Sequence, residues 1–405
     1  MSHNLYINHS ARAYRCRSGI STDTSCNFEF SYSTTLAFHR KFFSSYPQTP
    51  LINLPTLAEE LGVKHLLVKF EGERYGLPAF KILGASWATC TVLAQRLGVD
   101  LERISDLKEF RDLLDAEDKK ENRTKPVLYS STEGNHGRAV ARTANLLGLQ
   151  AKIYVPDSVS ELSREAIRSE GAEVVIVQGD YDDAVRIASK DAGIDKDRSI
   201  LIQDTAWEGY EEIPNLIVQG YSTMFAEIDE QLATSNIPSP SLVVVPVGVG
   251  SLAHSAVRYY RRSSSFPGSS NPSSSPKSSS SSSSSILTVE PKQASCLNTS
   301  LHAGHPVIVR TSHNIMPGLT CGTVSSTAFP DLLGGVDLSI VVDDDDDGQV
   351  VKAMKDLKEL GVNAGPCGAA SLAGVRGLKK TDLEKGNGNL DEDMVVVLIC
   401  TEGDG

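Results

Sequence analysis

The sequence predicts an α/β protein in which helices cover both faces of mostly parallel sheets. From residue 64 onward, short runs of β-branched residues alternate with longer amphipathic segments, and the short runs are apolar almost throughout. A strand buried on both faces has this continuous apolar character, and two parallel strands need a crossover helix between them. Because 405 residues exceed the usual size of one domain, two domains are expected.

Strands and helices are predicted to follow one another along most of the chain. The runs expected to form buried strands are 65–70, 127–131, 151–156, 173–179, 242–248, 286–291 and 394–400. The segments expected to form helices are 81–97, 136–148, 160–170, 181–193, 213–232, 250–262, 348–360 and 368–379.

Two segments are expected to be disordered. The serine-rich stretch 263–285 cannot bury apolar surface, and it falls between a predicted helix and a predicted strand, so it is interpreted as an insertion within a domain. Residues 1–30 form the second segment. The first 22 residues contain no Asp or Glu and carry Arg12, Arg15 and Arg17, so a weak organellar transit peptide is the alternative to a disordered start.

Composition narrows the class of protein. A formal net charge of −12 argues against a nucleic-acid partner, because phosphate contacts need clustered Lys and Arg. There is no run of 18 apolar residues, so no membrane span is expected. The seven cysteines are scattered without a CxxC pair, which favours a reducing compartment such as the cytoplasm and argues against a zinc site. No metal site is predicted.

Three loops carry residues suited to binding charged groups. In "LPAFKILGASWA" (77–88), Lys81 begins a predicted helix, where a solvated lysine is the ordinary interpretation. In "STEGNHGRAVA" (131–141), a strand leads into a helix whose first N–H groups suit an anion, although an ordinary capped turn has the same pattern. In "PVGVGSLAHS" (246–255), Gly248 and Gly250 allow several backbone amides to converge on one phosphate.

The glycine-rich loop points to a cofactor that carries one phosphate. It lacks the lysine of a GxxxxGK loop and does not complete GxGxxG, so it does not suit a nucleotide. A lysine, an anion loop, a phosphate loop and the strand-end hydroxyl of Thr401 together suit pyridoxal 5′-phosphate (PLP). The lysine amine binds its aldehyde, and its ring accepts the electrons of an α-carbanion.

The order of "PAFKILGAS", "STEGNHGRAVA" and "PVGVGSL" resembles the fold-type-II PLP enzymes. Within them, "QDTAWEGYEEIP" and "VEPKQASCL" make the chain similar to the diaminopropionate ammonia-lyases, over roughly residues 36 to 405 apart from the insertion. The resemblance implies a homodimer of chains with two three-layer α/β/α domains and an active site between them. The large domain would hold 31–92 and 203–405, and the small domain 93–202.

The resemblance also assigns the cofactor residues. Lys81 matches the lysine that holds PLP and removes the α-proton, and Phe80 precedes it. Asn135 matches the asparagine that hydrogen-bonds the 3′-oxygen, and Thr401 matches the hydroxyl that faces the ring nitrogen. The residues that match the phosphate loop are Gly248, Val249, Gly250 and Ser251.

The substrate, a small amino acid, is expected at two other segments. Asp204 matches the acidic residue beside the distal amine of the substrate, and Tyr210 lies on the same stretch. The loop residues expected to take the substrate carboxylate are Ser131, Thr132, Gly134 and His136. Glu133 stands where the family has the aspartate that handles the D-isomer. Because a misplacement of about 1 Å can slow a reaction ~100-fold, the L-isomer is expected to react faster.

The function predicted from these residues is PLP-dependent elimination of ammonia from 2,3-diaminopropionate, giving pyruvate and ammonia through aminoacrylate. The catalytic residues would be Lys81, Glu133 and Asp204. One alternative is a lyase similar to the serine and threonine dehydratases, against which "QDTAWEGY" argues. A second is a degenerate, non-catalytic protein of the same fold, which Glu133 and the serine-rich insertion favour. A third, a scaffold protein that uses the insertion as an interaction arm, is supported by composition alone.

Overall fold

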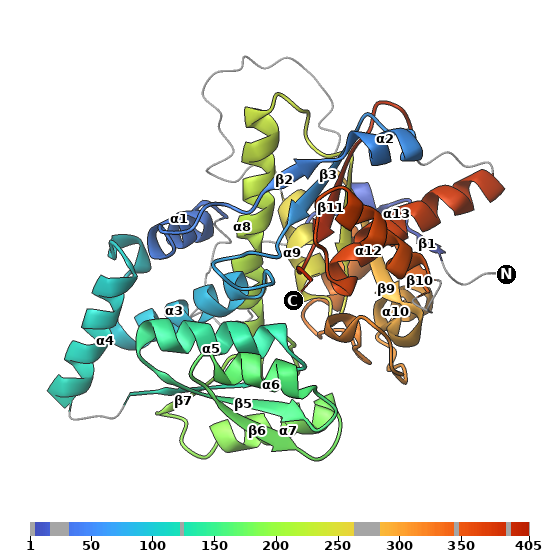
Figure 1. Cartoon of the computed structure of the whole chain (residues 1–405). Helices are drawn as coiled ribbons and strands as arrows, with labels where there is room; N and C mark the ends of the chain where they lie inside the picture. Colours follow the sequence, from blue (N-terminus) through green and yellow to red (C-terminus); the bar gives the residue numbers. More distant parts are fainter. Residues whose placement is uncertain are drawn as a thin grey trace. The chain divides into compact units, whose positions relative to one another are not determined.

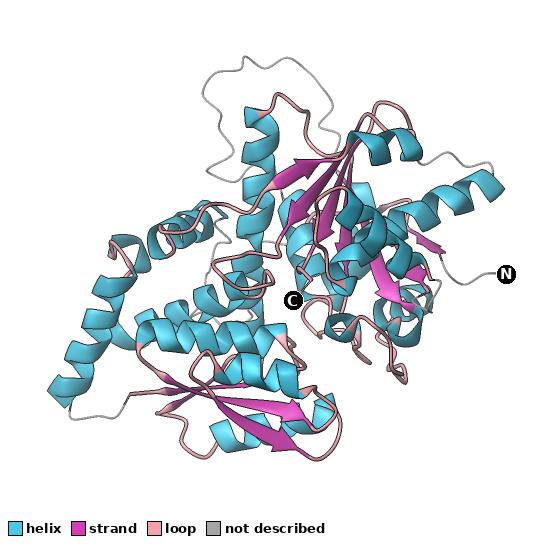
Figure 2. Ribbon diagram, in the orientation of Figure 1, coloured by secondary structure: helices cyan, strands magenta, loops and turns pink. Residues whose placement is uncertain are grey.

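Contacts divide the chain into two units that are each discontinuous in sequence. Unit 1 comprises Met1–Ser33, Thr49–Gly72 and Met224–Gly405, and unit 2 comprises Thr34–Gln48 and Glu73–Thr223. The structure is a computed structural model (Figures 1 and 2). It describes residues 5–16, 32–121, 125–262, 284–343, 348–385 and 390–404.

Unit 1 is built on a seven-stranded sheet with the order β1-β10-β9-β8-β11-β3-β2. The five inner strands are parallel, and the edge strands β1 and β2 are antiparallel to their neighbours. The strands are β1 (Leu5–Ile7), β2 (Leu51–Asn53), β3 (His65–Phe70), β8 (Leu242–Pro246), β9 (Ser285–Pro291), β10 (Leu338–Val342) and β11 (Val395–Cys400).

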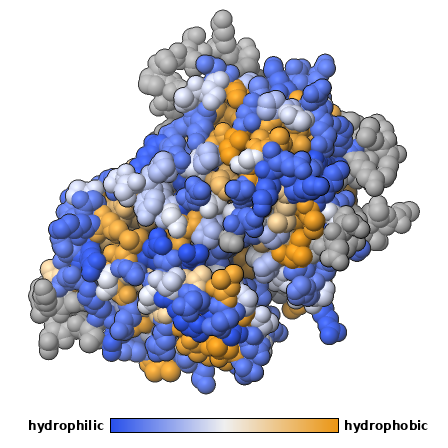
Figure 3. All heavy atoms as spheres, viewed as in Figure 1, coloured by the Kyte–Doolittle hydropathy of each residue, from blue (hydrophilic) through white to orange (hydrophobic). Residues whose placement is uncertain are grey.

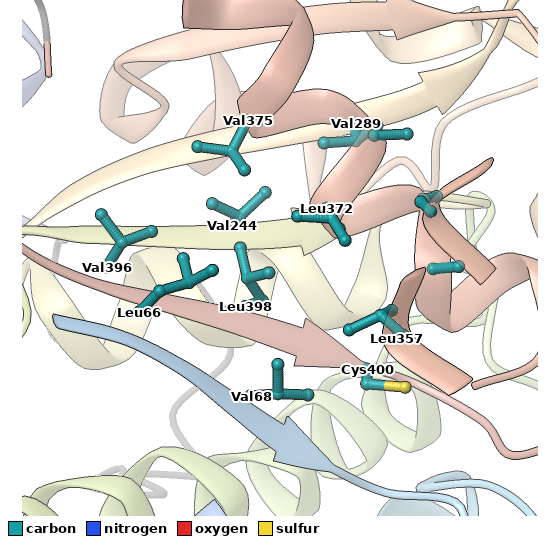
Figure 4. Packing of buried hydrophobic residues seen from close by; sticks show 14 of the residues in the cluster. Leu66, Val68, Val244, Val289, Leu357, Leu372, Val375, Val396, Leu398 and Cys400 are labelled. Atoms are coloured by element: carbon teal, nitrogen blue, oxygen red, sulfur yellow. The ribbon is translucent and has the colours of Figure 1, made fainter. Parts of the chain in front are cut away.

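The core of unit 1 lies between this sheet and α13. Leu372 and Val375 of α13 pack against Val244, Val289 and Leu398 of the sheet (Figure 4). Each buried aliphatic side chain of this kind contributes about 1.5–3 kcal/mol. The other helices of unit 1 are α2 (Pro55–Leu61), α9 (Ser251–Tyr260), α10 (Cys296–Ala303), α11 (Phe329–Gly335) and α12 (Gln349–Glu359), with α13 at Pro366–Lys385.

Unit 2 is a three-layer structure around a fully parallel sheet. Its sheet has the order β6-β5-β4-β7. On β5, Ile153 lies beside Gly137 of α5, whereas the next residue, Tyr154, packs against Ala184 and Ala188 of α7. Because successive strand residues point to opposite faces, α5 and α7 cover opposite faces of the sheet.

The elements of unit 2 begin with α1 (Tyr32–Phe42), whose first two residues belong to unit 1. They continue with α3 (Ile82–Leu97), α4 (Leu107–Glu121), β4 (Val127–Ser131), α5 (Asn135–Leu147), β5 (Gln150–Pro156), α6 (Glu161–Arg168), β6 (Glu173–Val177), α7 (Tyr181–Ala192) and β7 (Ser199–Leu201). The long helix α8 (Glu212–Thr234) supplies its first half to unit 2 and its second half to unit 1.

The predicted fold class is confirmed, as both sheets are mostly parallel and every predicted strand is present. Side chains on the face drawn in Figure 3 are largely hydrophilic, with apolar residues in separate patches. None of the helices among the described residues is long and apolar enough to cross a membrane.

Two predictions about segments differ from the structure. Residues 34–48, 73–92 and 203–223, expected in the large domain, group by their contacts with unit 2, where α3 packs on α5 and Trp87 donates a hydrogen bond to Gln219. Part of the start of the chain, expected to be disordered, is folded: β1 pairs with β10 and extends the sheet of unit 1. The insertion 263–285 lies outside the described residues except for its end, where Ser285 begins β9.

Candidate active site

Lys81 is a partly buried lysine in a direct ion pair. It immediately precedes α3, and its Nζ donates a hydrogen bond to Oδ2 of Asp204 over 2.6 Å. The side chains of Lys81 and Asp204 are 20% and 6% exposed. Phe80 lies beside the amine and packs edge-on against the buried ring of Tyr221. The solvated interpretation of Lys81 therefore does not hold, since its ammonium has a buried carboxylate as partner.

His136 is the second basic group near Asp204. Its Nε2 donates a hydrogen bond to the carbonyl of Ile202 over 2.9 Å, and its Nδ1 lies 3.7 Å from Oδ2 of Asp204. Burial lowers the pKa of His136. Burial alone would raise the pKa of Asp204, but His136 and the Lys81 ammonium outweigh it and hold this pKa at about 2. Asp204 is therefore an ionised carboxylate at neutral pH.

The anion loop joins β4 to α5, as expected. Ser131 ends β4, and its buried Oγ makes no hydrogen bond within the described part of the chain. Thr132 Oγ1 accepts the N–H of Gly134 over 2.9 Å. In the part of the chain that the structure describes, no side chain caps the start of α5, and a helix start of this kind is suited to an anion.

Glu133 lies on this loop as a half-buried carboxyl group. Burial, reinforced by the charge of Asp182 in the first turn of α7, raises the pKa of Glu133 to about 7. At neutral pH this group is thus about half protonated, which is the state expected of a group that takes and returns a proton.

Gln203 is a site residue that sequence reasoning missed. Its fully buried amide accepts the N–H of Ser131 over 3.0 Å and donates to the hydroxyl of Tyr181 over 2.6 Å. It thereby joins the anion loop to the start of α7. Its place next to Asp204 at a strand end was the available signal, because a long polar side chain buried there needs partners.

Tyr210, which is predicted to contact the substrate, binds two backbone groups through its hydroxyl. Its hydroxyl donates to the carbonyl of Leu201 over 2.6 Å and accepts the N–H of Gln203 over 3.0 Å. Its ring stacks on Trp207 with 4.4 Å between the centroids. Tyr210 thus braces the stretch that carries Asp204.

The predicted phosphate loop lies in unit 1, between β8 and α9. Gly250 has a φ of 96°, which favours glycine, and no side chain caps α9 there. A Cβ at Gly248 would lie 2.8 Å from the carbonyl oxygen of Gly318, so a side chain has no room. The loop therefore presents backbone at a helix start, the arrangement that binds phosphate.

Thr401 follows β11, the parallel neighbour of β8, so both loops leave the same edge of the sheet. Its Oγ1 is buried and has no hydrogen-bond partner among the described residues. A buried hydroxyl without a protein partner suits a polar ligand atom. Within unit 1, the glycine cradle and this hydroxyl suit the phosphate and a polar ring atom of PLP. Within unit 2, the Lys81 amine is the kind of group that binds its aldehyde. In the described ranges no three His, Cys, Asp or Glu side chains gather as a metal would require.

Comparisons with known proteins agree with this chemistry. The model of the "Pyridoxal-phosphate dependent enzyme" family matches residues 43–401. The diaminopropionate ammonia-lyase of Salmonella typhimurium is 38% identical over 76% of this chain and 72% of its own length. That of Escherichia coli K12 is 32% identical over 91% of this chain and 87% of its own length.

Solved structures give the same result. The Escherichia coli diaminopropionate ammonia-lyase in complex with an aminoacrylate-PLP azomethine reaction intermediate superposes with a TM-score of 0.79 at 29% identity, covering 99% of this chain and 94% of that one. Threonine deaminase isoform 2 from Solanum lycopersicum, at 20% identity and a TM-score of 0.68, shares the fold. The chain belongs to the family of pyridoxal-phosphate-dependent enzymes and, within it, to the diaminopropionate ammonia-lyases.

Proposed function

We propose that this protein eliminates ammonia from 2,3-diaminopropionate, giving pyruvate and ammonia with PLP as cofactor. The observation that carries the proposal is the contact of 2.6 Å between the Lys81 ammonium and the buried, ionised Asp204. When bound, PLP supplies an aldehyde for an amine and a ring that accepts the electrons left at the α-carbon. The residues of the chain must then hold the substrate and move its protons.

Lys81 is the residue that would hold the cofactor and take the α-proton. It is fixed at the start of a buried helix, where Asp204 and the Phe80 ring position its amine. In unit 1, Gly248 to Ser251 would take the phosphate, and Thr401 would face the ring nitrogen. Asn135 would bind the 3′-oxygen from the anion loop. As a neutral hydroxyl, Thr401 would leave the ring nitrogen unprotonated, which would suit elimination.

Asp204 would select a substrate with a distal ammonium group. In this structure it already binds one ammonium, that of Lys81, over 2.6 Å. The distal group departs as neutral ammonia, taking the electron pair of its C–N bond, only if it is protonated when that bond breaks. An ionised Asp204 beside it favours the protonated state. The hydroxyl group of serine has no charge to pair with this carboxylate, so the site discriminates against hydroxy amino acids.

The substrate carboxylate would bind the anion loop. The start of α5 offers N–H groups, and the Thr132 hydroxyl lies beside the N–H of Gly134. Ser131, at the end of β4, adds a buried hydroxyl that has no partner among the described residues. His136 holds the strand end through Ile202 and contributes its second nitrogen near Asp204. Glu133, with a pKa of about 7, is the base proposed for the D-isomer.

One experiment tests the proposal. The purified protein is titrated in turn with L- and D-2,3-diaminopropionate, serine and threonine, while the visible spectrum of the cofactor, pyruvate and 2-oxobutyrate are followed. We expect pyruvate from diaminopropionate, with the L-isomer faster, and loss of the cofactor band in Lys81→Ala. A cofactor band without any product would identify a degenerate protein, and faster turnover of serine or threonine would identify a dehydratase.

We also propose a homodimer that works in the cytoplasm. The family resemblance supports the dimer. Among the described residues, the cysteines Cys16, Cys90, Cys296 and Cys400 form no disulfide, in keeping with a reducing compartment. Light scattering of the purified holoenzyme, together with fractionation of cells that express it, tests both points; a monomer or a secreted protein would contradict them.

A further inference from the structure

The phosphate loop of unit 1 rests directly on the segment that carries α11. A Cβ at Gly250 would lie 3.1 Å from the Leu332 side chain and 3.3 Å from that of Val324, so the loop backbone touches this segment. The N–H of Ser325 also donates to the carbonyl of Val249 over 2.9 Å. The conformation of the loop is therefore coupled to the position of α11.

Asp331 ties α11 to α9, the helix that begins at the loop. Its Oδ2 accepts the Nε2–H of His254 over 2.9 Å and lies 3.3 Å from Nε of Arg258. His254 is buried, stands in the first turn of α9, and donates its own backbone N–H to the carbonyl of Gly250 over 2.8 Å. The carboxylate of Asp331 thus holds α11 against the helix turn that follows the loop.

The segment Asn8–Tyr14 near the start of the chain is bound to α11. The hydroxyl of Tyr14 donates to Oδ1 of Asp331 over 2.5 Å, and the amide of Asn8 donates to the carbonyl of Leu333 over 3.1 Å. The Tyr14 ring lies on the backbone of Gly334, where a Cβ would be 2.3 Å from the ring. Only a glycine allows this approach.

We infer that Asn8–Cys16 is a strap that holds the phosphate loop in its binding conformation, with Tyr14 and Asp331 as positioning residues. The inference rests on the proposed assignment of Gly248 to Ser251 as the phosphate site. The strap acts through α11 and leaves the lysine chemistry untouched. Weakening the strap should therefore lower the affinity for the phosphate group of the cofactor and leave the binding of its aldehyde unchanged.

The test compares two cofactors that differ only in the phosphate. The apoenzyme is titrated with PLP and with pyridoxal, and binding is followed by the visible band of the lysine adduct. Because one hydrogen bond to a carboxylate is lost, Tyr14→Phe should weaken PLP binding about three- to tenfold. Pyridoxal binding should stay unchanged.

Tyr259→Phe is the matched control. It removes the hydrogen bond of 2.7 Å between Tyr259 and Asp229, another tyrosine–aspartate pair, at the opposite end of the same helix α9. It should change neither affinity. The inference is overturned if Tyr14→Phe weakens both ligands equally, if it weakens neither, or if Tyr259→Phe has the same effect.

Two further results distinguish an error in the phosphate-loop assignment from a variant that does not fold. If the unaltered protein binds PLP no more tightly than pyridoxal, the phosphate-loop assignment falls, and the strap falls with it as a consequence. If Tyr14→Phe does not fold, Asn8→Ala loosens the strap without touching Asp331, and it should produce a smaller loss that again affects PLP alone; no such loss would overturn the inference.

Discussion

The two units contribute different kinds of groups to the proposed chemistry. The glycine loop and Thr401 of unit 1 offer uncharged backbone amides and one hydroxyl, in a place where side chains have no room. Unit 2 offers titratable side chains, among them the Lys81–Asp204 pair, His136 and Glu133. We infer that cofactor binding depends on the shape of the glycine loop in unit 1, whereas the reaction depends on the charged side chains of unit 2. Substitutions in unit 1 should therefore lower the affinity for the cofactor, and substitutions in unit 2 should lower turnover.

The largest effect is expected for Lys81→Ala in unit 2. Loss of the base and of the amine that binds the cofactor aldehyde should lower kcat for diaminopropionate by about 10⁴-fold or more. The phosphate site of unit 1 is unaltered, so PLP should still bind, without the visible band of a lysine adduct. Steady-state kinetics and equilibrium dialysis of PLP measure the two quantities. Complete loss of PLP binding would show that cofactor binding depends on Lys81 of unit 2 as well as on the glycine loop of unit 1.

A smaller but selective effect is expected for Asp204→Asn. The distal ammonium loses a buried, charged partner, so kcat/KM for L-2,3-diaminopropionate should fall roughly 10²-fold. Serine carries no such ammonium, and its slower turnover should change much less. The ratio of the two kcat/KM values is the quantity to measure. An equal loss for both substrates would assign Asp204 to positioning of Lys81 alone.

The pH dependence of D-isomer turnover should show a tenfold effect. Glu133 has a pKa of about 7 and accepts a proton only when ionised, so turnover of the D-isomer should rise about tenfold from pH 6 to pH 8. Burial is the main cause of this raised pKa and the charge of Asp182 adds to it, so Asp182→Asn should move the midpoint only part of the way to lower pH. Glu133→Gln should abolish D-isomer turnover and spare the L-isomer. If the midpoint is unchanged in Asp182→Asn and D-isomer turnover persists in Glu133→Gln, Glu133 does not take part in the reaction.

The strands of the two units differ in how well the sequence predicts them. The apolar strands β8 and β11 were predicted within two residues, because continuous apolar runs mark strands that are buried on both faces. The strands β1, β2, β7 and β10 were missed. Three of these are only three residues long, too short for a periodic pattern.

The local features of the candidate site could be predicted from the sequence, whereas its long-range contacts could not. The loops of unit 1 are local features, and their glycines stand together in the sequence. The pairing of Lys81 with Asp204, by contrast, joins residues 123 positions apart. The role of Gln203 depends on Ser131 and Tyr181, which only the folded sheet brings to it. Local patterns and the family resemblance selected the candidate residues, but the partners of these residues required the tertiary structure.

The smallest effect is expected for Tyr210→Phe. This variant tests whether Tyr210 contacts the substrate or only supports the backbone of the stretch that carries Asp204. The variant keeps the ring that stacks on Trp207 and loses a hydroxyl that satisfies the carbonyl of the half-buried Leu201 and the N–H of the buried Gln203. Leaving such groups unpaired costs about 1–3 kcal/mol, so the free energy of unfolding should fall by about that amount. Because the hydroxyl already has two backbone partners, KM for diaminopropionate should change less than about twofold, a difference of some 0.4 kcal/mol. Denaturant unfolding and steady-state kinetics measure the two outcomes. A large rise in KM with unchanged stability would instead place Tyr210 against the substrate, and the charged site of unit 2 would then extend beyond Asp204.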